Sequence, residues 1–155
     1  MILVTGGHGF IAANFLLEIL KDKKINVLNI DKSFPKKNRD NIKGLKSCKN
    51  YKFIKTNIGN KKKISYILKS FQPKYIINFA AETHVDHSIN NPSKTIKNNI
   101  IDTIRFYDEV YKYWKSLNFK IKKKIKIIQI STDEVYGSLK KNEKPFTETC
   151  STPIC

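Results

Sequence analysis

The sequence has few residues of the kinds that cross-link a chain, hold a metal or carry it across a membrane. Its 155 residues include only three cysteines, Cys48, Cys150 and Cys155, and these form no Cys-x-x-Cys pair. Histidines and cysteines also lack zinc-ligand spacing, so we expect reduced thiols and no metal site. No apolar run approaches the roughly 18 residues of a membrane span, and the N-terminus lacks the basic start of a secretory signal. We therefore expect a soluble, cytoplasmic protein without a membrane partner.

Arginine is almost absent, although the chain is strongly basic. The formal net charge is +17, and of 30 basic residues only Arg39 and Arg105 are arginine. Such a charge would normally suggest a nucleic-acid ligand. The lysines are spread along the chain, however, and abundant isoleucine and asparagine point to an AT-rich genome. We therefore interpret the charge as solvated surface and predict no nucleic-acid partner.

The apolar residues, 40% of the chain, suffice for one domain with a core. Short β-rich runs alternate with helical stretches, which implies parallel strands joined by right-handed crossovers. The predicted fold is α/β, a Rossmann-like doubly wound parallel sheet, incomplete, with about five strands present. We predict strands over residues 2–5, 25–30, 51–56, 74–80 and 125–131, helices over 9–21, 62–71 and 92–117, and a loop over 32–50.

The predicted helix 92–117 carries two apolar stripes. Asn91 can cap its start, and Pro92 fits its first turn. Because one stripe suffices to cover a sheet, the second suggests that another surface is buried too, such as that of a partner subunit. The alternative is a single broad face with exposed tyrosines. The stripes are Ile96, Ile100, Ile104, Tyr107, Tyr111 and Trp114, and Phe106, Val110, Tyr113 and Leu117.

The first strand runs directly into a glycine-rich turn over residues 5–12. A tight turn there brings a pyrophosphate against backbone N–H groups at the helix start. Gly6 permits a positive φ, Gly9 lets the cofactor backbone approach, and Ala12 stands where the pattern has a third glycine. Asp31 ends the next strand, 22 positions after Gly9, where a carboxylate binds both ribose hydroxyls and repels a 2′-phosphate. This context predicts NAD as the cofactor; a turn without a ligand is the alternative.

Two acidic residues, Asp133 and Glu134, follow the last predicted strand after Thr132. In open α/β sheets the ligand lies outside the carboxyl ends of the strands, so these side chains should project from the ligand edge. An adjacent acid and base suit the elimination of water, because one protonates a leaving hydroxyl while the other removes a carbon-bound proton. The alternative is an acidic surface turn.

A second polar segment, with Thr83, His84 and Asp86, follows the strand over residues 74–80. It should lie at the same edge of the sheet. We take these three residues as candidate substrate contacts; the alternative is that they only fix the loop.

Together the motifs resemble those of the dTDP-glucose 4,6-dehydratases, in the extended short-chain dehydrogenase/reductase superfamily. They span essentially the whole chain in the family's order. The most specific is STDEVYG, because related epimerases and decarboxylases of nucleotide sugars usually lack its Asp-Glu pair. The matching segments are VTGGHGFIA, LNID, YKFIKTNI, IINFAAETHVDHSINNP, NNIIDT, ISTDEVYGSL and PFTET.

The resemblance implies a lyase in which NAD oxidises C4 of dTDP-glucose, water leaves across C5 and C6, and hydride returns to C6. Thr132 would bind the 4-hydroxyl, Asp133 would protonate the leaving 6-hydroxyl, and Glu134 would take the C5 proton. It also implies a homodimer formed through the long helix. The cofactor-binding residues that it implies are Gly6, Gly9, Phe10, Ile11, Asp31, Asn57, Ile58, Ala80, Ala81 and Asn99.

Three departures from the family stand out. Asn57 replaces a usual aspartate that faces the adenine, and Asp102 replaces a small glycine, which should crowd the long helix. The family's Tyr-x-x-x-Lys pair, whose tyrosine deprotonates the 4-hydroxyl, lies after PFTET, and the sequence reaches Cys155 without it. We therefore expect a truncated NAD-binding domain over residues 1–155, without the sugar-nucleotide-binding part and inactive alone. The alternatives are an NAD-binding module without catalysis and another nucleotide-sugar epimerase or dehydratase.

Overall fold

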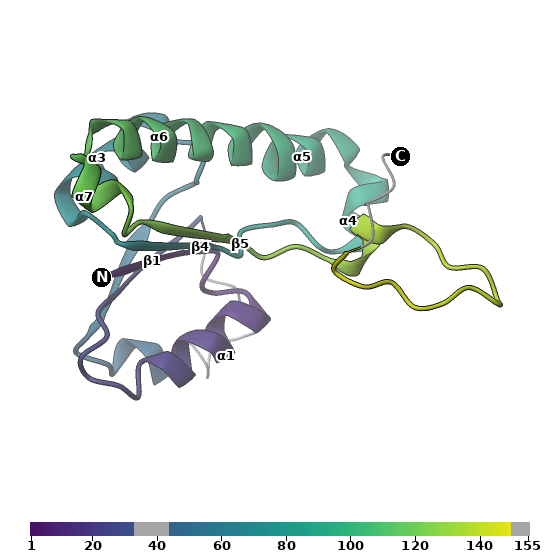
Figure 1. The fold of residues 1–155 in the computed structure, drawn as a ribbon, viewed down its shortest axis with the longest axis horizontal. Helices are drawn as coiled ribbons and strands as arrows, with labels where there is room; N and C mark the ends of the chain where they lie inside the picture. Colours follow the sequence, from purple (N-terminus) through teal and green to yellow (C-terminus); the bar gives the residue numbers. More distant parts are fainter. Residues whose placement is uncertain (33–43, 150–155) are drawn as a thin grey trace.

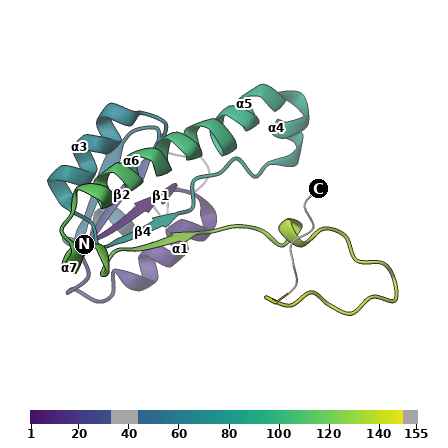
Figure 2. The same cartoon turned by 45° about the horizontal axis from the view of Figure 1, so that its top comes forward.

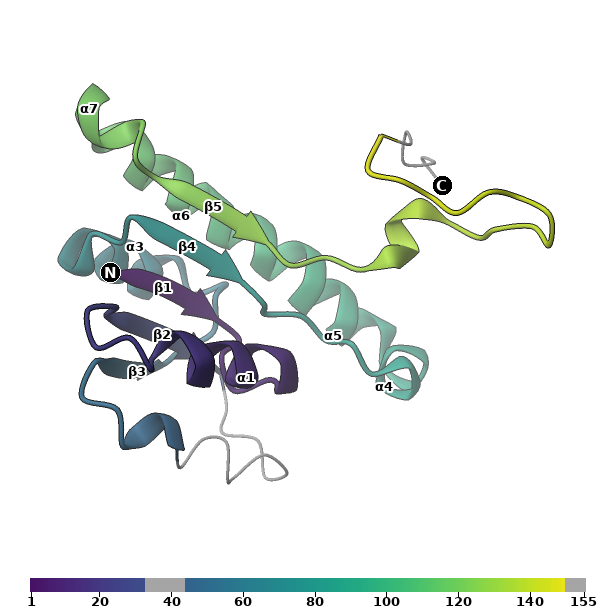
Figure 3. The same cartoon turned by 60° about the horizontal axis from the view of Figure 1, so that its bottom comes forward.

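The computed structural model describes residues 1–32 and 44–149, and these form one parallel five-stranded sheet between helices. The strand order is β3-β2-β1-β4-β5, with every neighbouring pair parallel, as Figure 3 shows. The order reverses direction at β1, as in doubly wound folds, so the predicted fold is confirmed. The strands are β1 Ile2–Thr5, β2 Val27–Asp31, β3 Tyr51–Lys55, β4 Tyr75–Asn78 and β5 Lys126–Gln129.

Helices cover both faces of the sheet (Figure 1). One face packs against α1 (Phe10–Ile19), and the other packs against α3 (Lys61–Phe71) and α6 (Asp102–Ser116). Two short helices, α4 (Val85–Asn90) and α7 (Phe119–Lys122), were not predicted. None of the described helices is long and apolar enough to cross a membrane.

Side-chain alternation along the strands divides the core into two clusters. On β1, Leu3 faces α3 and α6, where it joins Ile67, Phe106 and other buried residues. The next residue, Val4, belongs to the opposite cluster, which includes Leu16 of α1. Adjacent strand residues point to opposite faces, so a four-residue strand contributes to both clusters.

The predicted helix over residues 92–117 is present, but it is not α-helical throughout. The structure has α5 (Pro92–Ile96), a π-helical turn η1 (Lys97–Ile101) and then α6. Its start is as predicted, because Asn91 Oδ1 accepts a hydrogen bond from the Lys94 N–H at 3.2 Å. The π turn inserts extra backbone into the helix, which apolar spacing alone does not reveal. Helices α4 and α5, which precede η1 in the chain, extend past the carboxyl edge of the sheet (Figure 2).

The two apolar stripes of this helical region have different environments. Phe106, Val110 and Tyr113 are buried against the sheet. On the other stripe, Ile100 and Ile104 are 51% and 55% exposed. The core therefore uses one stripe and leaves most of the other at the surface.

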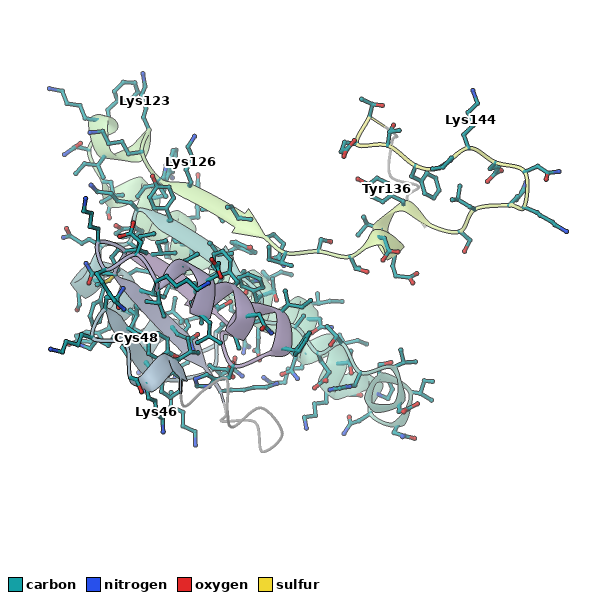
Figure 4. The ribbon with its side chains drawn as sticks, turned by 90° about the horizontal axis from the view of Figure 1, so that it is seen from below. Lys46, Cys48, Lys123, Lys126, Tyr136 and Lys144 are labelled. Atoms are coloured by element: carbon teal, nitrogen blue, oxygen red, sulfur yellow. The ribbon has the colours of Figure 1, made fainter. Side chains whose placement is uncertain are left out.

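Strand β5 forms an open edge of the described sheet. Its four residues are all exposed. The chain then continues past the sheet edge through a 3-10 turn, η2 (Asp133–Tyr136). Tyr136 lies on this outlying segment (Figure 4) and stacks on Phe146 with ring centroids 5.5 Å apart. Most of the predicted loop, residues 33–43, and both Cys150 and Cys155 lie outside the described residues.

Candidate functional site

The turn between β1 and α1 presents backbone N–H groups at the carboxyl edge of the sheet. Gly6 has a φ of +69°, and a Cβ there would lie 2.7 Å from the Ala80 Cα. Both observations require glycine. Gly9 is the N-cap residue of α1, and no side chain caps the helix start by a hydrogen bond. Such a helix start attracts anions, so the turn fits a phosphate group.

A cavity of about 540 Å³ opens beside this turn. Ligand sites commonly measure roughly 300–1,000 Å³. The cavity lies where the direction of strand order reverses between β1 and β4, which is the usual ligand position in open α/β sheets. Its lining residues are Gly6, His8, Gly9, Phe10, Ile30, Asp31, Lys32, Thr56, Asn57, Ile58, Phe79, Ala80, Ala81, Glu82, Thr83, His84, Asn98 and Asp102.

Eight of the ten predicted cofactor-binding residues line the cavity, and Ile11 and Asn99 do not. Asn99 lies behind the wall. Its Nδ2 donates to the Glu82 carbonyl at 2.9 Å, and its Oδ1 accepts from the Glu82 N–H at 2.7 Å. Of the predicted substrate contacts, Thr83 and His84 line the cavity, whereas Asp86 is exposed on α4.

Sequence reasoning missed several lining residues. Thr56 and Phe79 directly follow β3 and β4, so the rule that ligands bind at carboxyl ends could have found them. Asn98 and Asp102 reach the cavity from the helical layer, and only the tertiary fold reveals them. The Asn98 Nδ2 is buried, and no described residue accepts a hydrogen bond from it. A buried donor in a cavity wall suits a polar ligand atom or water.

Asp31 ends β2 beside the glycine turn. Its Oδ2 accepts a hydrogen bond from the His8 backbone N–H at 3.2 Å. The carboxylate and the phosphate-binding turn therefore share one wall of the cavity. Hydroxyl groups of a ribose attached to a diphosphate would reach a carboxylate in this position.

Asn57 and Asp102 are in direct contact. Asn57 Nδ2 donates to Asp102 Oδ2 at 2.9 Å, and Asn57 Oδ1 accepts from the Gly59 N–H at 2.8 Å. Lys97 Nζ lies 2.9 Å from the same carboxylate oxygen, and Arg105 is also near. Burial raises the pKa of Asp102, but the bonds from Lys97 and Asn57 and the nearby positive charges outweigh it and leave that pKa below its ordinary value.

Asp102, which was expected to crowd the long helix, packs its carboxylate against Gly59. A Cβ at Gly59 would lie 2.1 Å from Asp102 Oδ1. The carboxylate therefore occupies space that the missing side chain of Gly59 leaves open.

Thr132, Asp133 and Glu134 lie past the carboxyl end of β5, at the same edge but outside the cavity lining. Thr132 Oγ1 donates to Asp133 Oδ1 at 3.1 Å and accepts from the Glu134 N–H at 3.4 Å. All three are exposed. The Thr132 hydroxyl thus contacts the Asp133 carboxyl group and the Glu134 backbone, and all three side chains are accessible from solvent.

The fold, strand order and glycine turn define a dinucleotide-binding α/β domain of the Rossmann type. Residues 3–154 match the family described as GDP-mannose 4,6 dehydratase, and the chain belongs to this family.

Its relatives include dTDP-glucose 4,6-dehydratases, which confirms the resemblance seen in the sequence. The enzyme of Xanthomonas campestris pv. campestris (strain B100) is 39% identical over 147 residues, covering 95% of this chain and 41% of the relative. That of Escherichia coli is 36% identical over 148 residues, covering 96% and 41%. The structure of the Bacillus anthracis enzyme in complex with NAD matches with a TM-score of 0.77 and 35% identity, covering 99% of this chain and 43% of that one. The chain thus spans about two fifths of the length of these relatives.

Proposed function

We propose that this chain is the NAD-binding domain of a lyase that converts dTDP-glucose to dTDP-4-keto-6-deoxyglucose. The observation that carries the proposal is that Gly6, Gly9 and Asp31 line one cavity. This cavity lies at the start of α1, which no side chain caps. The B. anthracis relative, 35% identical, is described in complex with NAD. The curated relatives that cover 95–96% of this chain are dTDP-glucose 4,6-dehydratases.

The residues of the cavity fit NAD. Backbone N–H groups of the turn from Gly6 to Gly9 would hold the pyrophosphate, and Phe10 and Ile11 begin the helix behind it. Asp31 would accept hydrogen bonds from a ribose. When bound, NAD supplies an acceptor and donor of hydride. The other proposed contacts are Asn57, Ile58, Ala80, Ala81 and Asn99.

The chain's own chemistry would come from η2. Elimination of water needs a proton donor and a proton acceptor close together. Asp133 would hold the proton delivered to the leaving 6-hydroxyl, and Glu134 would take the proton from C5. The Thr132 hydroxyl, which already contacts Asp133, would orient the 4-hydroxyl.

The remaining parts of the proposal concern substrate, partner and location. Thr83, His84 and Asp86 would contact the nucleotide sugar. A homodimer would form through helix 92–117, whose Ile100 and Ile104 are exposed. We also propose a cytoplasmic location, which cell fractionation would test.

Calorimetry with the purified chain tests cofactor binding. We expect NAD to bind more tightly than NADP. Asp31→Asn should narrow this preference by about tenfold, because the charge that repels a 2′-phosphate is lost. Asp22→Asn, an exposed residue after α1, is the matched control and should change neither affinity. If NAD gives no binding heat, the proposed function is wrong.

A second candidate, an NAD-binding module without catalysis, is favoured by the position of Thr132, Asp133 and Glu134 outside the cavity lining. We expect the chain with NAD and dTDP-glucose to form no 4-keto product. Robust turnover would contradict this expectation. The coding sequence downstream of Cys155 separates the candidates: an in-frame Tyr-x-x-x-Lys helix supports the lyase, and its absence supports the module.

A further inference from the structure

His8 occupies an unusual position in the glycine-rich turn. Although it lies between two glycines at the cavity, it is only 1% exposed. Its ring packs on Phe53 with centroids 4.4 Å apart, and its Nε2 lies 3.3 Å from Tyr51 Oη. Its backbone N–H donates to Asp31. The side chain therefore points under the turn, toward β3, instead of toward a ligand.

Tyr51 connects His8 to a second peptide of the same turn. Asn29 Nδ2 donates to Tyr51 Oη at 2.8 Å, and Asn29 Oδ1 accepts from the Gly7 N–H at 3.0 Å. A Cβ at Gly7 would lie 2.2 Å from that oxygen, so the backbone can approach Asn29 only as glycine. Side-chain contacts therefore connect the Gly7 peptide through Asn29 and Tyr51 to the His8 ring. The backbone N–H of His8 makes the separate contact with Asp31.

The direction of the hydrogen bond between Tyr51 and His8 follows from the surroundings of Tyr51. Burial, aided by the charge of Asp31 and opposed by the bond from Asn29, raises the pKa of Tyr51 to about 12. Tyr51 therefore keeps its hydroxyl proton near neutral pH. Since Tyr51 Oη already accepts from Asn29, it can donate this proton to His8 Nε2.

We propose that His8 is a positioning residue for dinucleotide binding: its ring fixes the Gly7 peptide through Tyr51 and Asn29, and its backbone N–H holds the Asp31 carboxylate. The proposal rests on the dinucleotide-binding function proposed above. The buried ring does not touch the ligand. It acts by pre-organising the diphosphate and ribose contacts, which lowers the ordering that binding would otherwise require.

The test measures the NAD dissociation constant by calorimetry and the unfolding midpoint by circular dichroism. His8→Leu keeps an apolar side chain but removes the acceptor, and should weaken NAD binding about tenfold, the size of one buried hydrogen bond. His8→Gln retains an acceptor for Tyr51 and should recover most of the affinity. Tyr51→Phe, which only removes the hydroxyl, should weaken binding about as much as His8→Leu. The double variant His8→Leu/Tyr51→Phe should bind no more weakly than the weaker single variant, because both break one network.

Tyr66→Phe, on the exposed side of α3, is the control and should bind NAD like the wild type. If the wild type binds NAD and His8→Leu binds it with an affinity within twofold of the wild type, the positioning role is overturned but the proposed function is not. Additive losses in the double variant would also overturn it, since they would mean independent contributions. Absence of NAD binding to the wild type would overturn the proposed function and this inference together. If His8→Leu does not fold, Tyr51→Phe decides the question.

Discussion

The carboxylate of Asp102 joins three parts of the molecule at the level of single side chains. It receives a hydrogen bond from Asn57 after β3 and an ion pair from Lys97 of the π turn, and its own side chain is 2% exposed. Asn57 and Asp102 touch, and Gly59 provides the space for the carboxylate.

Asp102→Asn should lower the free energy of unfolding by about 1–2 kcal/mol at neutral pH, because hydrogen bonds to a charged group are lost. The lowered pKa of Asp102 fixes the pH dependence. Its stabilising contribution is complete above the ordinary pKa of 3.8 and is lost as the pH falls through the lower value of the folded state. Urea unfolding of both proteins should therefore differ near pH 7 and converge in acid.

The matched control is Asp108→Asn on the same helix. Asp108 pairs with Lys61 at 3.3 Å, but its side chain is 49% exposed, and exposed ion pairs contribute little. We expect a much smaller loss of stability than in Asp102→Asn. A difference between wild type and Asp102→Asn that persists unchanged in acid would contradict the role assigned to the carboxylate.

At the level of helices and strands, the success of sequence reasoning depended on local apolar patterns. The run over residues 2–5 is β1, and the other strands shifted by only one or two residues at their ends, because short β-rich runs bounded by polar residues leave few alternatives. Helix α4 escaped prediction because its apolar residues Val85 and Ile89 are 69% and 72% exposed and so show no core-facing period. The π turn η1 escaped because one extra residue in a turn barely alters apolar spacing.

The same distinction holds for the candidate site. Gly6, Asp31 and Ala80 were predictable because each lies at the end of a parallel strand or within two residues after it, and such ends meet at one edge. The contact of Asn57 with Asp102 was not predictable, since it joins residues 45 positions apart on different layers. Which side chains meet across layers depends on packing that no local pattern records.

Asn99, in the π turn η1, is predicted to hold the backbone of Glu82 at the cavity wall. Because Asn99 bonds both the N–H and the carbonyl of Glu82, Asn99→Ala should leave two backbone groups unpaired at the cavity wall. We expect a loss of about 1–3 kcal/mol in the free energy of unfolding and faster amide exchange at residues 82–84. Asn118→Ala is the control, because Asn118 only caps α7. It should leave exchange near Glu82 unchanged. Unchanged protection of the Glu82 amide in Asn99→Ala would contradict the prediction.

At the level of the whole molecule, the exposed stripe of α5, η1 and α6 is the apolar surface that most needs explanation. Ile96, Ile100 and Ile104 are each more than half exposed, and Tyr111 and Trp114 continue the same face. Contiguous apolar patches of this kind usually mark interfaces. The proposed homodimer would bury this stripe while the opposite stripe remains packed on the sheet.

Ile104→Arg should weaken self-association at least tenfold, because it places a charge at the centre of the proposed interface. Sedimentation equilibrium near physiological salt is the appropriate measurement, since the net charge of +17 on each copy opposes association when screening is weak. Tyr66→Arg adds the same charge to an exposed tyrosine of α3 and should leave association unchanged. A wild-type chain that stays monomeric, or equal effects of both variants, would refute the proposed interface.

The division of the core into two clusters also sets an order of events during synthesis. The described residues of the α1-side cluster all fall between positions 2 and 79, whereas the opposite cluster needs Phe106, Val110 and Tyr113. Because a ribosome releases the N-terminal end first, at about 5–20 residues per second, the first layer can close while α6 is still being made. During that interval of about a few seconds, α3 is the helix among the described residues that would shield the second face of the sheet. We therefore expect a stage of synthesis at which Leu3 and Ile76 are partly uncovered, and α6 would end that stage when it emerges.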